Sequence, residues 1–562
     1  MIRSIFGIIP RSYRRQSLRV VGAVFLRAIL NFIGVTMLIP ILALMLNVDN
    51  NSELVSWLNR VFAVEDRANL AIVVCGLSLG VIVAKNLLLL MLHRYERNYV
   101  FSLYRDLTRQ LYLGYYSRGL NFIKANNSSV LTRNVNVVSL TFVTGVLRPI
   151  LTIMGEALLL ILICGALAIY SSRVALFVSV VFLPILAIVY LAFRRRLNAL
   201  GASENEVQRA KGRIVSETYR GYADIEVGGT MPHMLRMFDS SVDEVVKLRK
   251  RHSTLSMLPS IFIEVGLVLG LVLIVLFSID GSGNMGLMFG IYAVAAIRLI
   301  PAIRNMLTQW STLRYNRHAV DTLKEAGVGE VATDLVASDE RMELHEGIEL
   351  RNVSFKFDDA QRPTIENLSF TIKRGERLGI RGASGVGKTT LFNLILGLYR
   401  PTSGVIIVDG LELTQERMAK WHNSIGYVSQ SVFISDGTLA ENIAFGVDEQ
   451  NIDYHRVNEA IAQANLMEFV ESLSKGINTP IGEQGSRISG GQRQRIGIAR
   501  ALYKGCDIML FDEATSSLDE VCEESINESI TRLKEQNPNL TIVVIAHRES
   551  TLEYCDRVIT LE

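Results

Sequence analysis

Residues 380–390, Ile-Arg-Gly-Ala-Ser-Gly-Val-Gly-Lys-Thr-Thr, contain the pattern G-x-x-x-x-G-K-[ST], filled by Gly382, Gly385, Gly387, Lys388 and Thr389. A short strand is predicted just before this stretch, over 376–380, and a helix just after it, over 390–396. The glycines allow positive φ angles that bring backbone N–H groups close to an anion, and the helix N-terminus adds partial positive charge. The stretch therefore predicts a phosphate-binding loop, with Lys388 near the terminal phosphates and the Thr389 hydroxyl as a ligand of Mg²⁺.

Two apolar runs farther along the chain end in residues suited to phosphate chemistry. The run 508–511 predicts a strand buried on both faces, and it is followed by Asp512 and Glu513. Ligands bind at the carboxyl ends of strands in open α/β sheets, so Asp512 is expected in the Mg²⁺ shell and Glu513 beside the attacking water. A second buried strand, 542–546, ends in His547, which is expected to contact the γ-phosphate and that water.

Gln430 and the stretch 489–492 complete the set. Gln430 follows the predicted strand 425–429 and is expected to bridge Mg²⁺ to a moving segment. A helix follows Ser489, Gly490, Gly491 and Gln492, so its N-terminal N–H groups form a second phosphate site. Each feature alone is compatible with ordinary structure, such as a glycine turn or an acidic strand end. Together and in this order they predict an ATP-hydrolysing α/β domain over 347–562, where strand-like and helical segments alternate.

The first 310 residues are too apolar for a soluble protein. The whole chain of 562 residues is 49% hydrophobic and 20% charged, and its length indicates two or more domains. A bilayer core needs about 20 apolar residues as a helix, and six segments qualify, at about 20–46, 68–92, 138–170, 174–193, 255–279 and 284–310. A net charge of +3 gives no reason to expect nucleic acid as a partner. The five cysteines have no metal-site spacing and fit a reducing cytosol.

Arginines set the predicted orientation of these spans. They precede the first span and follow the second and the fourth, while the other connections are short and acidic, so both termini are expected in the cytoplasm. The cytoplasmic connections are long and polar, and their helical patterns break near 118–121 and 219–224. We expect each to form a long helix, a short transverse turn and a long helix back.

Ionisable residues lie within or near the predicted spans: Arg27, Lys85, Arg148, Glu156, Glu264 and Arg298. A charge at mid-span costs about 2.5–3.5 kcal/mol, so each should face the interior of the bundle or a wet cavity. Two interpretations remain open. The charges pair internally or reach toward the interface, or the excess of cations lines a cavity for an anionic headgroup.

The chain resembles an ATP-binding-cassette (ABC) exporter half-transporter. The resemblance implies a polytopic α-helical membrane domain (1–315), a linker (316–346) and an α/β P-loop ATPase domain (347–562). The stretch from Gly382 to Thr390, with Ser384, is similar to the Walker A loop, and 508–513 is similar to the Walker B strand. Gln430 matches the glutamine of the Q-loop, and residues 489–492 match the signature motif. Residues 516–519, which include Asp519, match the D-loop, and His547 matches the switch histidine. Phe357 stands where the family has an adenine-stacking tyrosine, and 482–485 resembles a segment that contacts the transverse turns.

In this family two ATPase domains pair head to tail, with ATP between the Walker A loop of one and the signature of the other. The resemblance therefore implies ATP and Mg²⁺ as cofactors and a homodimer in the cytoplasmic (inner) membrane that alternates a cavity between the two faces. Segments 27–40 and 258–264 are similar to lipid-linked oligosaccharide flippases, which favours a lipid-linked glycan as substrate. Peptides, drugs or other lipids are the alternative. An ATP-gated protein that does not pump is disfavoured by intact Glu513, and an importer by the fusion of both domains.

Overall fold

The structure is a computed structural model that describes residues 2–37, 41, 67–170, 172–278, 285–327, 340–357, 360–482, 488–514, 520–546 and 548–562. The chain divides into two compact units. The helical unit comprises Met1–Arg118 and Phe122–Thr333, and the α/β unit comprises Gly119–Asn121 and Asp334–Glu562.

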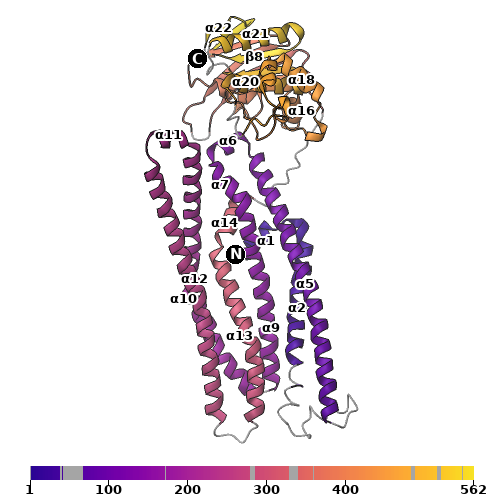
Figure 1. Cartoon of the computed structure of the whole chain (residues 1–562), viewed down its shortest axis with the longest axis vertical. Coiled ribbons are helices and arrows are strands. Elements are labelled where there is room, and N and C mark those ends of the chain that lie inside the picture. Colours follow the sequence, from indigo (N-terminus) through magenta and orange to yellow (C-terminus); the bar gives the residue numbers. More distant parts are fainter. Residues whose placement is uncertain are drawn as a thin grey trace. The chain divides into compact units, whose positions relative to one another are not determined.

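The helical unit is built from long helices that run side by side (Figure 1). Two short elements begin it, α1 (Ile2–Ile8) and a 3₁₀ turn (Arg11–Tyr13). The long helices are α2 (Arg14–Thr36), α5 (Arg67–Ser117), α9 (Arg148–Tyr170), α10 (Ser172–Arg220), α12 (Met231–Ser278) and α13 (Met285–Tyr315). Leading into α9 are α7 (Ser128–Arg133), a π-helical turn (Asn134–Val138), α8 (Ser139–Phe142) and a second π-helical turn (Val143–Leu147).

Short helices form where the sequence predicts transverse turns. The first is α6 (Gly119–Ala125), between α5 and α7, and the second is α11 (Tyr222–Val227), between α10 and α12. Gly119 has a φ of 78°, a left-handed conformation that glycine adopts without strain, and this residue lets the chain turn out of α5. The prediction of two long helical hairpins with a transverse element at the tip is confirmed.

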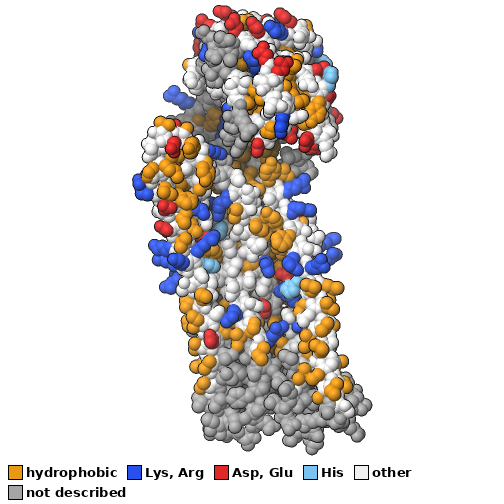
Figure 2. Space-filling view, in the orientation of Figure 1, with side chains coloured by type: hydrophobic (Ala, Val, Ile, Leu, Met, Phe, Trp, Pro, Cys, Tyr) orange, Lys and Arg blue, Asp and Glu red, His pale blue; other side chains and the backbone are white. Residues whose placement is uncertain are grey.

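Among the described residues, three helical stretches are long and apolar enough to cross a membrane: Arg11–Thr36, Asn69–Ser117 and Ser128–Ile169. They overlap the first three predicted spans, although residues 38–40 and 42–46 of the first span lie outside the described residues. The other three predicted spans fall on α10, α12 and α13 and stay predictions. Large apolar side chains are exposed along α5, among them Ile72 at 70% and Leu79 at 65%. Figure 2 shows such side chains on the surface of the helical unit, with Lys and Arg side chains gathered farther along the helices. This surface suits lipid, because hydrocarbon replaces the water that exposed leucines would otherwise meet.

The α/β unit contains two sheets. The antiparallel sheet has the order β2-β1-β4-β5, from β2 (Ile365–Lys373), β1 (Gly347–Phe355), β4 (Ser403–Val408) and β5 (Leu411–Glu412). The parallel sheet has the order β6-β7-β8-β3-β9, from β6 (Ile425–Val428), β7 (Ile508–Asp512), β8 (Thr541–Ile545), β3 (Arg377–Gly382) and β9 (Arg557–Leu561). Every predicted strand is present. The two central strands β7 and β8 are buried at each position, and all of their residues except Asp512 and Thr541 are apolar.

Helices cover both faces of the parallel sheet. On one face α15 (Lys388–Ile395) packs its buried Leu391 and Phe392 against Leu510 of β7. On the other face α20 (Gly490–Lys504) and α21 (Glu520–Gln536) pack against Met509 and Phe511. Alternate residues of one strand thus belong to two separate cores. The remaining helices are α14 (His318–Glu325) in the helical unit and, in the α/β unit, α16 (Met418–Ser424), α17 (Leu439–Ile443), α18 (Tyr454–Gln463), α19 (Met467–Ser472) and α22 (Glu549–Leu552).

Candidate functional site: a nucleotide site at the strand ends

The predicted phosphate loop lies between β3 and α15. Gly385 and Gly387 have φ angles of 84° and 106°, which side chains rarely tolerate. A Cβ on Gly387 would also lie 3.0 Å from the carbonyl oxygen of Thr364. Ser384 and Thr389 are exposed, and Thr390 follows Thr389 in the first turn of α15. The loop and the following helix N-terminus therefore present backbone N–H groups and hydroxyls around one point, as phosphate binding requires.

Lys388 is held inside this loop. Its ammonium group donates to the carbonyl oxygens of Gly382 and Ala383, at 2.8 and 3.1 Å, and its side chain is only 4% exposed. The Lys388 Nζ atom also lies 3.9 Å from a carboxylate oxygen of Glu513. A buried cation held by neutral carbonyls keeps its full charge available, so an anion that enters the loop meets an ammonium group already in place.

Asp512 ends β7 beside the phosphate loop. Its Oδ1 atom accepts from the Thr389 hydroxyl at 3.3 Å, which brings the two predicted Mg²⁺ residues together. No group of three or more His, Cys, Asp or Glu side chains arranged for a metal occurs among the described residues. One carboxylate and one hydroxyl beside a phosphate site nevertheless fit Mg²⁺, which is often held by one or two carboxylates together with substrate phosphates and water. When bound, Mg²⁺ neutralises charge on the β- and γ-phosphates.

Glu513 follows in a strained conformation. Its φ of 49° is rare for a residue other than glycine, and its backbone N–H donates to the carbonyl of Ile545 on β8. The Gln430 amide donates to Glu513 Oε2 at 3.3 Å. The structure thus brings together Glu513, Gln430, Lys388, Asp512 and Thr389, which lie far apart in the sequence.

Two residues at this site escaped the sequence prediction. Gln494 on α20 is buried, and its amide donates to the backbone carbonyl of Gln430 at 2.7 Å, which anchors the Gln430 backbone. Tyr427 on β6 donates its phenol hydroxyl to Asp512 at 3.3 Å. The signal for Tyr427 was a polar-tipped aromatic residue in the strand that precedes Gln430.

The predicted second phosphate site forms the N-terminus of α20. Ser489 is the N-cap: its hydroxyl accepts from the Gln492 N–H at 3.2 Å, and the Gln492 side chain accepts from the Ser489 N–H at 2.9 Å. This capping box starts a 15-residue helix with Gly490 and Gly491 in its first turn. Among the described hydrogen bonds, none joins these four residues to Lys388 or Glu513 of the same chain.

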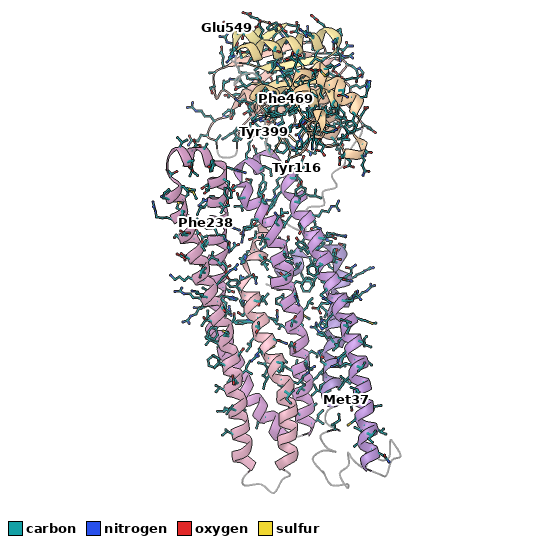
Figure 3. All side chains as sticks on the ribbon, viewed as in Figure 1. Met37, Tyr116, Phe238, Tyr399, Phe469 and Glu549 are labelled. Carbon is teal, nitrogen blue, oxygen red and sulfur yellow. The ribbon has the colours of Figure 1, made fainter. Side chains whose placement is uncertain are left out.

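Phe357 belongs to an aromatic cluster just past β1. Its ring meets those of Phe355 and Tyr399 edge to face, with centroids 4.9 and 5.6 Å apart. Tyr399 is labelled in Figure 3. The Phe357 ring is half-buried, so one side remains free to stack on a planar ligand. His547, Asp519 with its neighbours 516–518, and 483–485 lie outside the described residues.

The charges predicted near the membrane spans separate into two groups. Arg27 on α2 bonds Glu96 on α5 at 2.6 Å, and both side chains are nearly buried. In contrast, Glu156 and Arg298 bond neutral amide groups. Glu156 accepts from the Asn305 amide, and Arg298 on α13 donates to Asn31. Internal pairing therefore accounts for Arg27, through a carboxylate that lies beyond the predicted end of the second span.

Comparisons with known proteins agree with this site. Over 84% of its length, the chain is 31% identical to a protein of Burkholderia orbicola (strain AU 1054) named ATP-dependent lipid A-core flippase, and it covers 79% of that protein. Residues 365–516 match the family described as ABC transporter. The chain belongs to this family. A protein of the same name from Syntrophus aciditrophicus (strain SB) is 30% identical over 81% of this chain and 75% of its own length.

The same fold occurs in the structure of a bacterial Atm1-family ABC exporter with ATP bound. The TM-score is 0.73 at 19% identity, over 98% of this chain and 94% of that one. The chain is thus an ABC exporter half-transporter, a helical membrane domain fused to an ATPase domain, and it couples ATP hydrolysis to transport.

Proposed function

We propose that this ABC exporter flips an anionic lipid-linked glycan across the cytoplasmic (inner) membrane. The observation that carries the proposal is a pair of cations, Lys85 of α5 and Arg298 of α13, that lie against the same face of α2. Arg298 bonds Asn31, and the Lys85 ammonium group lies against Gly34, one turn farther along the same helix. Neither forms a salt bridge within 4 Å among the described residues, and the Glu156 carboxylate, whose charge acts on Arg298, accepts from the Asn305 amide.

A pair of like charges inside predicted spans is expensive unless an anion completes it. A phosphate or diphosphate group offers two negative charges and several acceptor oxygens, and it matches the guanidinium of Arg298 bidentately. The lipid part of the substrate would lie along the apolar helices. Relatives named ATP-dependent lipid A-core flippases support a glycolipid as the class of substrate.

We further propose a homodimer with two identical ATP sites. The N-terminus of α20, with Ser489 and Gln492, would complete the site formed by Lys388 and Glu513 of a second copy. Within one site, Lys388 and the loop N–H groups bind the phosphates, and Thr389 and Asp512 hold Mg²⁺. Glu513 orients and polarises the attacking water, and Gln430 holds the carboxylate of Glu513 in place.

The test measures ATPase activity of the full chain in lipid nanodiscs. Polyprenyl-diphosphate glycans and phosphorylated glycolipids are titrated against neutral glycolipids, peptides and cationic drugs, with Glu513→Gln as the blank. Selective stimulation by the phosphorylated lipids is the expected result. Stimulation by peptides or drugs alone would leave the exporter intact and overturn the substrate class.

Two variants test the cation pair itself. Lys85→Ala and Arg298→Ala are each expected to raise the half-stimulating concentration of phosphorylated lipid by about tenfold, since each removes a charge-assisted hydrogen bond. Basal ATPase should stay the same. Arg317→Ala serves as the control, because Arg317 is exposed and lies outside the predicted spans. Equal effects of all three variants would contradict a role of the pair in substrate binding.

A further inference from the structure

Tyr427 lies on the strand next to the one that carries Asp512. Strand β6 forms one edge of the parallel sheet and pairs with β7, and the register sets Tyr427 beside Leu510. Asp512 comes two residues after Leu510, so its side chain leaves β7 on the same face. That face is the one covered by α15, because Leu510 packs in the same apolar cluster as Leu391 and Phe392. A tyrosine side chain is long enough to reach its diagonal neighbour on the adjacent strand.

The phenol of Tyr427 makes this diagonal contact. Its hydroxyl donates to Asp512 Oδ2 at 3.3 Å, while the Thr389 hydroxyl donates to Asp512 Oδ1 at 3.3 Å. Each oxygen of a carboxylate that is 4% exposed is therefore hydrogen-bonded by a different element, β6 or α15. A tyrosine phenol has an ordinary pKa of about 10, so Tyr427 keeps its proton and remains a donor at neutral pH.

We infer that Tyr427 is a positioning residue for the Mg²⁺ site. Its hydroxyl fixes the rotation of the Asp512 carboxylate so that Oδ1 faces the Thr389 hydroxyl. The inference rests on the proposed roles of Thr389 and Asp512 at the nucleotide site. Partners that orient a metal-binding carboxylate contribute strongly to metal affinity, because an unrestrained carboxylate must be ordered when the metal binds. Tyr427 itself touches neither nucleotide nor water in this scheme. It acts through Asp512.

The opposing explanation is that Tyr427 only fills space. Tyr427 is 37% exposed and lies on an edge strand, where aromatic residues are common because they pack well on a half-buried sheet surface. Tyr427→Phe keeps the ring and removes only the hydroxyl, so it separates the two explanations. Tyr454→Phe is the matched control, because Tyr454 is an exposed tyrosine at the start of α18 in the same unit.

The experiment uses the full chain in nanodiscs and reads metal binding directly. Mn²⁺ is titrated in the presence of ATP and followed by electron paramagnetic resonance, with Glu513→Gln in every variant to prevent turnover. Binding of a fluorescent ATP analogue in EDTA gives the metal-free nucleotide affinity. Tyr427→Phe is expected to weaken Mn²⁺ binding by about tenfold, at the low end for loss of an orienting partner. Metal-free nucleotide affinity should change less than twofold, and Tyr454→Phe should match the parent in both assays.

Two further variants separate this inference from the site assignment on which it rests. Asp512→Asn should weaken Mn²⁺ binding by more than Tyr427→Phe, and adding Tyr427→Phe to Asp512→Asn should have no further effect. If Asp512→Asn weakens Mn²⁺ binding and Tyr427→Phe does not, Tyr427 has no positioning role. If Asp512→Asn also leaves Mn²⁺ binding unchanged, the nucleotide-site assignment itself is wrong.

Discussion

The two units of this chain bury charge in opposite ways. In the helical unit, Arg27 is neutralised by Glu96 at 2.6 Å, and both side chains are nearly inaccessible. In the α/β unit, Lys388 and Asp512 are buried just as deeply, but Lys388 donates to two carbonyl oxygens and Asp512 accepts from two hydroxyl groups; the Glu513 carboxylate lies 3.9 Å from Lys388, beyond hydrogen-bond distance. An ion pair satisfies both charges, whereas neutral partners leave a charge with most of its field.

This difference indicates which buried charges support the fold and which are available to a ligand. A phosphate can replace the two carbonyl oxygens that hold Lys388, because it offers the ammonium a stronger partner. No ligand gains comparably by separating Arg27 from Glu96. Lys85 and Arg298 belong with the charges that are available to a ligand, since Arg298 bonds a neutral amide. The comparison therefore supports our choice of these two residues as the substrate-binding cations.

The largest expected effect comes from Glu513→Gln. The substitution preserves the shape of the side chain and removes the group that polarises water, so turnover should fall by about a thousandfold. ATP affinity should remain within a few-fold, because Lys388 and the loop provide the phosphate contacts. Phosphate release and binding of a fluorescent nucleotide measure the two quantities separately.

Glu549→Gln is the control for this variant. Glu549, labelled in Figure 3, pairs with Arg381 at the exposed surface of the same unit, where an ion pair is worth little. Its turnover should equal that of the parent protein. A Glu513→Gln protein that retained a tenth of the parent turnover would show that the strained acidic residue after β7 has no catalytic role.

The nucleotide site was predictable in large part because it is made of local motifs. The loop at 380–390, the strand ends at 512–513 and the start of α20 each carry their chemistry within a few adjacent residues. The sheet then brings the first two together, since parallel strands end at one edge. Gln494 and Tyr427 were missed for the converse reason. Each acts across two elements, and nothing in its own neighbourhood in the sequence points to Gln430 or Asp512.

The membrane charges were predicted less well. Arg27 was identified as an ionisable residue in a span, but its partner Glu96 lies 69 positions later and beyond the predicted end of the second span. Helix rotation and tilt decide which side chains meet, and these depend on packing between helices. Counting charges by span could not separate Arg27, which is paired with a carboxylate, from Arg298, which bonds an amide.

Glu96→Gln should have the next largest effect, on stability. It leaves Arg27 as a buried charge without its carboxylate, which costs about 3 kcal/mol for pairs of this kind. We expect the apparent melting temperature of the purified protein to fall by several degrees. Replacing both partners by leucine or methionine should recover most of this loss, because the charges disappear together.

Glu206→Gln, at an exposed position on α10, is the control for Glu96→Gln. If the two substitutions lowered the melting temperature equally, the Arg27–Glu96 pair would not contribute specifically to stability.

The smallest expected effect concerns pH. Burial, with the guanidinium groups of Arg133 and Arg209, lowers the pKa of His318 on α14 from 6.5 to about 4; the Glu204 and Asp321 carboxylates oppose this only partly. Between these values the unfolded chain binds a proton that the folded chain does not, so this contribution to stability is complete above pH 6.5 and is lost as pH falls toward 4. His318→Asn should therefore reduce the loss of melting temperature between pH 7 and pH 5. It should not abolish that loss, because burial also lowers the pKa of His252 and His422.

His455→Asn is the matched control for His318, since His455 is largely exposed on α18 and lies in the other unit. Its pH dependence of melting should match that of the parent protein. An unchanged slope in His318→Asn would mean that His318 takes up its proton in the folded state as readily as in the unfolded one. Water or Glu204 would then screen the charges of Arg133 and Arg209. The junction between α13 and α14 would in that case accept a protonated histidine without a carboxylate partner, as the phosphate loop accepts Lys388, whereas Arg27 is paired with Glu96.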